Sequence, residues 1–466
     1  MKPPRREIRS PLKVCTRNPR YFADENDRPV YLAGSHTWSN IQEFKSDHPF
    51  DYDGYLTWLQ NWGHNFTRLW TWEAGTNAEW MNGWTEEKMI VEPTIYARTG
   101  PGAAADEGPK FDLSKFNEAF FERLHNRAEI AGSRGFYVSI MLFQGYELEK
   151  RDRKINPWDC HPYNRRNNVN GIDGDPLQAN NGYKLQTLEI PEVTKLQEEY
   201  LRKIVDTVNH LDNVLYEVSN ESHRSSTRWH YHIVDFVHDY EKSKRKQHPV
   251  GMTSQNAYKL RGLNEDLFSG PADWVSPSIE AEGGYNYAYN PPPGDGSKVI
   301  VSDTDHLWGI GGDSAWVWKS FTRGLNVLFM DPYDTGFMDP NDSGLINSGE
   351  IDRDWDSARG AMGQTREFAE RMDMAKMFPH PELSHSHYCL ANPGLSYLVY
   401  YPSEMTKRIQ VDLRSCDGWL SVEWYNPDTG NSVSGERVEG GRKLVFFSPF
   451  TNSAILYLNK IPIKSQ

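Results

Sequence analysis

Two carboxyl groups at the ends of apolar segments are the side chains of this chain best suited to chemistry. Glu221 follows Asn220 directly, where the apolar run 214–218 ends. Asp303 and Asp305 stand at the end of a second apolar run. A carboxylate is costly to place at the edge of a core unless it has a function. Two carboxyl groups on either side of one bond, a proton donor and a nucleophile or base, are what glycoside hydrolysis requires.

Each motif alone has a simpler explanation. Asn220 could cap a helix that begins after it, with Glu221 in the first turn, where the helix dipole favours an acid. Asp303 and Asp305 could likewise cap a helix or pair with a cation. For a single motif this explanation is the better one. The two motifs favour catalysis together, if the fold brings them to one pocket.

Strand-like and helix-like segments alternate over residues 1–380. Nearly continuous apolar runs such as 136–143 predict strands that are buried on both faces, as in a parallel sheet covered by helices. Apolar residues three and four positions apart, as in 191–211, predict helices. The alternation predicts an α/β fold, a (β/α)8 TIM barrel, with its site at the C-terminal ends of the strands. The strands that carry Glu221 and Asp303 are then the fourth and the seventh, which face each other across the mouth. The expected strands are 29–34, 65–70, 136–143, 214–222, 249–253, 274–276, 298–303 and 326–331, and the expected helices are 51–62, 116–130, 191–211, 227–243, 264–269, 314–322 and 355–377.

The two ends of the chain and one internal segment depart from this pattern. Residues 14–34 predict an N-terminal β-hairpin. Residues 277–297 contain three consecutive prolines and four glycines, so no helix is expected between the sixth and seventh strands. After Pro379, short strands separated by turns predict a β-sandwich. We therefore expect a catalytic barrel domain at 1–380 and an accessory β-sandwich at 381–466.

Composition and charge restrict the function classes. Hydrophobic residues make up 38% of the 466 residues, and the formal net charge is −13. Such an acidic chain is not expected to bind nucleic acid or an anionic membrane, and no apolar run is long enough to span one. The four cysteines are far apart in the sequence, so neither structural zinc nor a disulfide framework is expected, and no cofactor is predicted. No secretory signal is recognised, which predicts a cytoplasmic protein, or a secreted or periplasmic one if a signal was removed.

Aromatic and polar residues at the predicted strand ends suit a sugar ligand. The 16 Trp and 24 Tyr offer flat surfaces that stack on sugar rings, although such residues also fill cores. Polar groups beside them would select a hydroxyl pattern, because a buried polar group left unpaired is costly. Each residue alone could be ordinary packing, but the set at one barrel end favours a binding pocket. The expected sugar-binding residues are His36, Trp38, Trp70, Trp72, Glu73, Gln144, Asn220, His306, Trp308, Asp331 and Tyr333.

The barrel resembles the glycoside hydrolases of clan A. Asn220 and Glu221 match the Asn-Glu pair that supplies the acid/base after the fourth strand of that clan. Arg68 matches the second-strand arginine that lies near the nucleophile, and Asp303 stands where the clan has a Glu nucleophile. The resemblance implies that Glu221 is the acid/base, that Asp303 is the nucleophile and that Arg68 belongs to the substrate site.

The whole plan also resembles the apiosidase-like group, which includes proteins that degrade pectin side chains and carry a C-terminal β-domain of the collagen-binding type. The segments 34–38 and 422–430 carry this likeness, which spans nearly all of the chain on short motifs. It implies a carbohydrate partner from plants or microbes.

The primary hypothesis is therefore an O-glycosyl hydrolase that is retaining and exo-acting. Loops 73–110 and 144–190 both follow strands and are expected to narrow the mouth into a pocket for chain ends. Asp303 is shorter than Glu by roughly 1.5 Å of reach. The gap between the carboxyl groups could then exceed the ~5–5.5 Å of retaining enzymes and permit inversion. Asp305 is an alternative second acid, with Asp303 supporting it.

Further alternatives stay open. Glu280 and Glu282, after the sixth strand, are additional candidate acids. An Asp in place of the clan's Glu also fits a non-catalytic carbohydrate-binding protein on a decayed barrel. A cluster of His306, Asp303 and Asp305 would permit metal-assisted hydrolysis.

Overall fold

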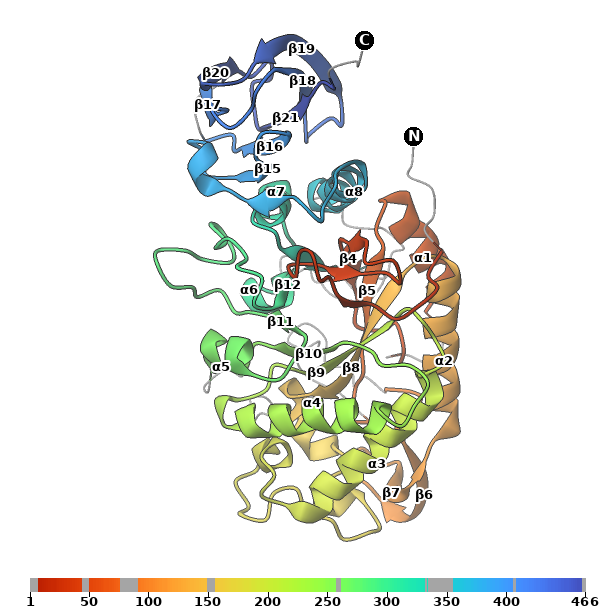
Figure 1. The fold of residues 1–466 in the computed structure, drawn as a ribbon. Coiled ribbons are helices and arrows are strands. Elements are labelled where there is room, and N and C mark those ends of the chain that lie inside the picture. Colours follow the sequence, from red (N-terminus) through yellow and green to blue (C-terminus); the bar gives the residue numbers. More distant parts are fainter. Residues whose placement is uncertain are drawn as a thin grey trace.

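The chain folds into a closed parallel barrel followed by an antiparallel β-domain, as its computed structural model shows (Figure 1). Two parts of the long loops expected at the mouth, 76–90 and 149–155, lie outside the described residues. The structure describes residues 7–43, 50–75, 91–148, 156–256, 261–331, 333, 355–404 and 408–462.

Eight parallel strands form the barrel, and every residue in them is buried. Each strand packs against the barrel interior on one face and against helices on the other, which explains why its sequence is nearly continuously apolar. The predicted TIM barrel is thereby confirmed. In order around the barrel, the strands are β4 (Ala33–His36), β5 (Phe66–Leu69), β8 (Tyr137–Gln144), β9 (Val214–Asn220), β10 (Val250–Thr253), β11 (Trp274–Ser276), β12 (Val299–Asp303) and β13 (Asn326–Met330).

Helices cover the outside of the barrel (Figure 1). α1 begins after Asp51, whose side chain accepts a hydrogen bond from the Gly54 N–H, and α3 begins at Pro191, which has no N–H to leave unpaired. Residues 277–297 form no helix, as expected. The helices are α1 (Tyr52–Asn61), α2 (Glu118–Ser133), α3 (Pro191–Val208), α4 (Thr227–Glu241), α5 (Asn264–Ser269), α6 (Thr304–Leu307), α7 (Ser314–Thr322) and α8 (Asp356–Arg371).

The loop after β5 is more regular than the sequence indicated. An antiparallel hairpin, β6 (Tyr96–Ala103) and β7 (Pro109–Phe116), occupies much of the segment expected to be irregular. Phe116 belongs to β7 and stacks on Tyr96 at 5.6 Å, so the prediction that it begins the next helix was wrong. Asn117 caps α2 instead, because its side chain accepts from the backbone N–H of Ala119.

A three-stranded antiparallel sheet at the N-terminus closes one end of the barrel. β2 (Phe22–Ala23) and β3 (Pro29–Val30) form the expected hairpin, and β1 (Lys13–Val14) pairs with β2. Apolar side chains of this sheet pack on residues near the N-terminal ends of the barrel strands. The cluster includes Leu12, Phe22, Val30, Phe66, Tyr137, Leu215, Trp274 and Val299. Side chains fill this N-terminal end of the barrel, so a site is left to the opposite end, where the strands have their C-termini.

The C-terminal domain is a six-stranded antiparallel sheet with a two-stranded ribbon packed on it, which confirms the predicted β-sandwich. It contacts the barrel through α7 and α8, where Trp318 stacks on Tyr400 at 6.3 Å and Phe368 meets Tyr425 at 5.2 Å. The sheet order is β14 (Phe378–Pro379), β15 (Cys389–Asn392), β16 (Ser396–Tyr401), β21 (Ala454–Lys460), β18 (Trp419–Tyr425) and β19 (Ser432–Glu439), and the ribbon is β17 (Arg408–Asp412) with β20 (Lys443–Phe447).

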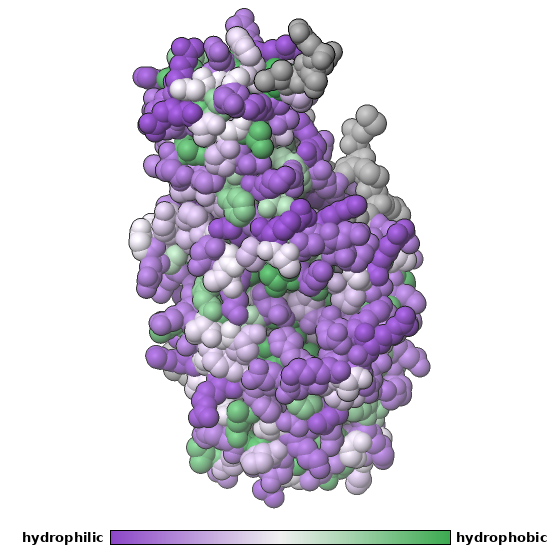
Figure 2. Space-filling view, in the orientation of Figure 1, coloured by the Kyte–Doolittle hydropathy of each residue, from purple (hydrophilic) through white to green (hydrophobic). Residues whose placement is uncertain are grey.

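The surface in Figure 2 is mainly hydrophilic, with apolar residues scattered over it. Among the described residues, every helix is too short or too polar to span a lipid bilayer.

Candidate active site

A cavity of about 470 Å³ opens where β4, β5, β8, β9 and β12 end. This volume is in the range of small-ligand pockets. Residues from distant parts of the sequence meet here because parallel barrel strands all end at the same rim. Of the residues predicted for the site, the cavity is lined by Trp38, Trp70, Trp72, Gln144, Asn220, Glu221, Asp305, His306 and Trp308. Lining residues that the sequence did not single out include Tyr146, Asn256, Arg261, Ile279 and Met330.

Glu221 is held at the cavity by an unusual turn. β9 ends at Asn220, and the backbone of Glu221 then adopts a φ of +48°, a left-handed conformation that is uncommon outside glycine. Such strain is found where the surrounding structure holds a residue for function. Gly145 supports the turn, because its N–H donates to the Asn220 carbonyl at 2.7 Å. A β-carbon on Gly145 would lie only 2.5 Å from the Ser222 backbone nitrogen.

Gly145→Ala is therefore expected to displace the turn that carries Glu221. If Glu221 takes part in catalysis, kcat should fall by about 10²-fold, since a shift of about 1 Å in a catalytic group has effects of that size. Steady-state hydrolysis measurements with matched thermal unfolding curves check this. Gly360→Ala in α8 is the control, because a β-carbon there comes no closer than 3.8 Å to another residue. An unchanged kcat in Gly145→Ala would show that the turn does not depend on this contact.

Asp305 is the second carboxyl group of the cavity. The Asp303 side chain accepts from the Asp305 N–H at 3.0 Å and starts the short helix α6, which turns Asp305 toward the cavity. Its Oδ2 lies 3.8 Å from Arg68 Nη1 and 3.8 Å from His306 Nε2 and accepts no hydrogen bond from the described residues. Burial raises the pKa of Asp305 well above its usual range, and the charges of Asp303 and Glu221 raise it further.

Asp303, which the resemblance implies as the nucleophile, is fully buried and does not line the cavity. Arg68 donates to its Oδ2 at 2.5 Å, and His36 Nε2 lies 3.6 Å from its Oδ1. Burial alone would raise the pKa of Asp303, but the charge of Arg68 and the contact with His36 hold it well below its usual range. Asp303 is thus a permanent anion beneath the cavity, held by a buried arginine.

Arg68, on β5, also contacts Glu217 on β9, and the sequence did not predict this contact. Its Nε donates to Glu217 Oε2 at 2.8 Å, and Ser139 donates to the same oxygen at 3.1 Å. Burial raises the pKa of Glu217, against the charge of Arg68. Glu217 was missed in the sequence, where it is the one acidic residue within the apolar run 214–218. That interruption is the signal that could have identified it.

A chain of hydrogen bonds fixes the orientation of the side chains between Gln144 and His306. Gln144 Oε1 accepts one hydrogen bond from the Tyr146 N–H at 3.2 Å and a second from the side-chain amide of Asn220 at 3.4 Å. Asn220 Oδ1 then accepts from His306 Nε2 at 3.1 Å, and Ser276 donates to His306 Nδ1 at 2.7 Å. Burial lowers the pKa of His306 to about 4, so the ring is neutral with its hydrogen on Nε2.

This tautomer opposes the metal interpretation of Asp303, Asp305 and His306, although the three groups lie close enough to hold an ion. A metal-binding imidazole nitrogen needs a free lone pair. Here Nδ1 accepts from Ser276, and Nε2 carries the hydrogen that binds Asn220. Metal-assisted hydrolysis through this cluster therefore does not fit the hydrogen bonds of the site.

Several predicted residues lie outside the cavity. His36 is buried beneath it and stacks on Trp70 at 5.3 Å, and Glu73 lies behind the wall. Asp331 forms a two-pronged ion pair with Arg359 at 2.7 and 2.9 Å. Tyr333 also lies away from the cavity and packs on Tyr55 and Trp58. The candidate acids Glu280 and Glu282 are exposed and do not line the cavity either.

Comparison with known proteins supports the fold more than the chemistry. Residues 91–259, less than half of the chain, match the family described as "Domain of unknown function (DUF6298)". No curated protein matches the chain in sequence.

Solved glycoside hydrolases share the architecture over almost the whole chain. One protein described as a glycoside hydrolase is 11% identical, covers 97% of both chains and gives a TM-score of 0.59. A glycoside hydrolase family 5 protein from Bacteroides vulgatus ATCC 8482 is 13% identical, with 97% of this chain and 93% of that chain covered and a TM-score of 0.59. At such identities the likeness establishes the fold alone.

Proposed function

We propose that this chain hydrolyses O-glycosidic bonds of a plant or microbial oligosaccharide or polysaccharide, with Glu221 and Asp305 as the two carboxyl groups that flank the bond. The observation that carries the proposal is their place in one cavity, at the ends of the fourth and seventh barrel strands. Trp38, Trp70 and Trp72 line the same cavity and suit the faces of a sugar ring.

The two carboxyl groups support a division of roles. Burial, and after it the charges of Asp303 and Glu221, raise the pKa of Asp305, so this carboxyl group holds a proton where an exposed aspartate would have lost it. Glycoside hydrolysis needs one protonated and one ionised carboxyl group. The likeness to clan A gives Glu221 the acid/base role and Asp305 the role of nucleophile or base for water, whereas the raised pKa of Asp305 taken alone would favour Asp305 as the proton donor. Asp303 positions both Asp305, through the cap of α6, and Arg68.

The proposal is tested by incubating the purified protein with a panel of plant and microbial glycans and following released sugars, with the anomer of the first product resolved by NMR. Retention of configuration and release of single terminal sugars are expected. Sugar binding without turnover across the panel would instead support a carbohydrate-binding protein. The likeness to the apiosidase-like group directs the panel first to pectin side chains.

Two aromatic rings extend the cavity toward solvent. Trp308 lines the cavity, donates its indole N–H to the Gly311 carbonyl at 3.0 Å and packs edge-on against Trp316 at 5.8 Å. Tyr289, which is 67% exposed, lies parallel to Trp308 at 6.4 Å. A second sugar ring could stack on this platform while the first occupies the cavity.

Tyr289→Ala is expected to raise KM for a trisaccharide or longer substrate several-fold and to leave kcat and the KM for a short aryl glycoside unchanged. One lost stacking contact contributes about 0.5–1.5 kcal/mol, which corresponds to such a factor. Tyr289→Phe, which keeps the ring, is the matched control and should behave like the wild type. An equal effect on short and long substrates would contradict the platform.

A further inference from the structure

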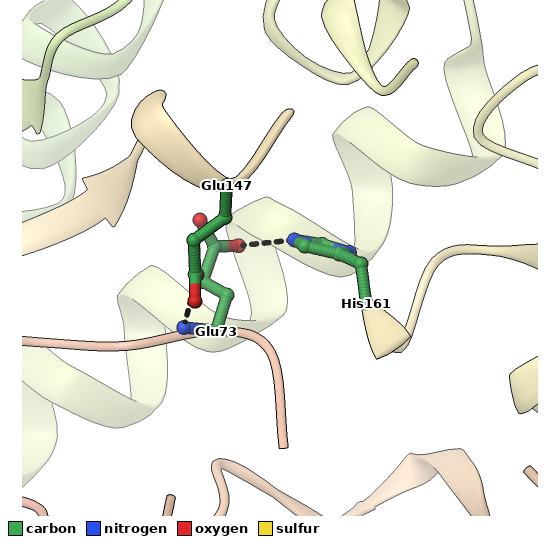
Figure 3. Close-up of side chains that lie close together, drawn as sticks. All are labelled: Glu73, Glu147 and His161. Atoms are coloured by element: carbon green, nitrogen blue, oxygen red, sulfur yellow. Dashed lines mark hydrogen bonds and ion pairs between the residues drawn. The ribbon is translucent and has the colours of Figure 1, made fainter. Parts of the chain in front are cut away.

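Figure 3 shows a second buried polar cluster, which is joined by hydrogen bonds to the backbone of the cavity wall. It consists of Glu73, which follows Trp72 after β5, Glu147 in the turn after β8, and His161. Glu73 is 7% exposed, and the other two side chains are fully buried. His161 Nε2 lies 3.8 Å from Glu73 Oε1 and makes no hydrogen bond with the described residues.

The two carboxyl groups hold the backbone of the cavity wall. Glu73 Oε2 accepts from the Gln144 N–H at 2.9 Å. Glu147 Oε2 accepts from the N–H groups of Glu73 at 2.8 Å and Ala74 at 3.1 Å. Gln144 and Trp72, which precedes Glu73, both line the cavity. The state of this cluster therefore bears on the position of two residues that contact the proposed substrate.

The imidazole shows what the cluster can bind. The backbone N–H of Tyr163 donates to His161 Nδ1 at 3.2 Å, and burial lowers the pKa of the ring to about 3. The ring is therefore neutral, with its hydrogen on Nε2, the atom that faces Glu73. Glu73, Glu147 and His161 are close enough to hold a metal ion, but this nitrogen presents an N–H rather than a lone pair. The ring thus presents a hydrogen-bond donor to a carboxyl oxygen and no lone pair to a cation.

Two carboxylates at this depth are costly to keep ionised. Burial raises the pKa of Glu73 to about 8 and that of Glu147 well above its usual range, where the charge of Glu73 raises it further. The other described groups whose titration is coupled to Glu73 are phenols, and burial raises the pKa of each, so they stay neutral. They are Tyr96, Tyr163 and Tyr200.

We propose that Glu73 is a positioning residue that works as a neutral carboxylic acid. Its proton allows the Glu73–Glu147 pair to stay dry and so holds Trp72 and Gln144 in the cavity wall. Loss of this proton would draw water into the cluster and loosen the wall. The consequence for stability stands on the cluster alone, whereas the consequence for turnover rests on the proposed glycosidase function.

The sign of the effect on stability follows from proton binding. A glutamate titrates near 4.3 in the unfolded chain, roughly, and Glu73 titrates near 8 in the folded one. Between these values the folded state binds more protons, so its stability is full below the lower pKa and is lost as pH rises toward the higher one. Glu73→Gln keeps the shape of the neutral acid and cannot ionise, so it removes this loss.

The test compares thermal unfolding midpoints of wild type and Glu73→Gln at about pH 4 and about pH 9. We expect equal midpoints at the lower pH and, at the higher pH, a variant more stable by several degrees. Glu282→Gln, which alters an exposed carboxyl group, is the matched control and should shift neither midpoint. If Glu73→Gln does not accumulate in folded form, Glu147→Gln carries the test with the same expected sign.

A Glu73→Gln variant that is less stable than wild type at high pH would overturn the proposal. So would a divalent metal found in stoichiometric amount in the wild type by elemental analysis and lost from the variant. With a hydrolysable glycan in hand, the pH–rate profile of the variant should extend to higher pH than that of the wild type, whose cavity wall loosens as Glu73 loses its proton. Absence of any turnover in both proteins would refute the proposed function and leave the stability result to decide on the proton.

Discussion

Glu221→Gln is expected to lower kcat by roughly 10²- to 10⁴-fold, the usual contribution of general acid–base catalysis. The amide has nearly the shape of the carboxyl group but cannot deliver or take up a proton. KM should change little, because the turn at φ +48° that places the side chain depends on the backbone and on Gly145. The measurement is initial-rate hydrolysis of the best glycan from the panel, with the fold checked by thermal unfolding.

Asp305→Asn and Asp303→Asn separate the two acids after β12. Asp305 lines the cavity, and its replacement should lower kcat at least as far as that of Glu221. Asp303 is buried against Arg68, so its replacement should lower stability first and act on turnover only through the placement of Asp305. Glu280→Gln is the matched control outside the cavity. If Asp303→Asn is slow but fully stable while Asp305→Asn stays active, then Asp303 rather than Asp305 is the second catalytic carboxyl group.

The roles of Glu221 and Asp305 can be distinguished by the leaving group. An aryl glycoside whose phenolate leaves without protonation needs no acid for the first bond cleavage. If Glu221 is the acid/base, Glu221→Gln should regain much of its lost rate for bond cleavage on such a substrate, whereas Asp305→Asn should not. The opposite pattern would exchange the two roles.

The barrel could be predicted because local sequence determines it. Runs such as 136–143 are apolar throughout because both faces of β8 are buried, and the polar residues after each run mark the rim. The hairpin β6–β7 was missed because its glycines and prolines hide the alternation of Phe111 and Leu113, both of which are buried. Turn residues dominate the local signal there, while the pairing of β6 with β7 across the turn at 104–108 determines the structure.

The carboxyl pair that we propose as catalytic could be predicted only in part. The sequence places Asp303 and Asp305 at one strand end, two residues apart, and either could face the mouth. The cap that Asp303 forms on α6 decides the matter, because it turns Asp303 inward and Asp305 to the cavity. Glu217 and His161 were missed for a related reason. Their roles depend on Arg68 and Glu73, which are far away in the sequence.

Arg68→Met is expected to lower the free energy of unfolding by about 3–5 kcal/mol, the usual cost of removing one partner from a buried ion pair. Arg68 is fully buried and binds Asp303 at 2.5 Å and Glu217 at 2.8 Å. Methionine fills similar space but leaves both carboxylates without their cation. Denaturant unfolding followed by circular dichroism measures the loss, and Arg68→Lys, which keeps the charge without the forked geometry, should fall in between.

The pH dependence of this loss identifies its cause. In the wild type the pKa of Asp303 lies below its usual range, so the stability it contributes is present at neutral pH and is lost only as pH falls through that low value. Without Arg68, burial would raise the pKa of Asp303 above its unfolded value, and the deficit should then grow as pH rises from about 4. The double variant Arg68→Met with Asp303→Asn should recover part of the lost stability, since it removes one stranded charge. A deficit that is independent of pH, and unrelieved in the double variant, would mean that Arg68 contributes packing rather than charge.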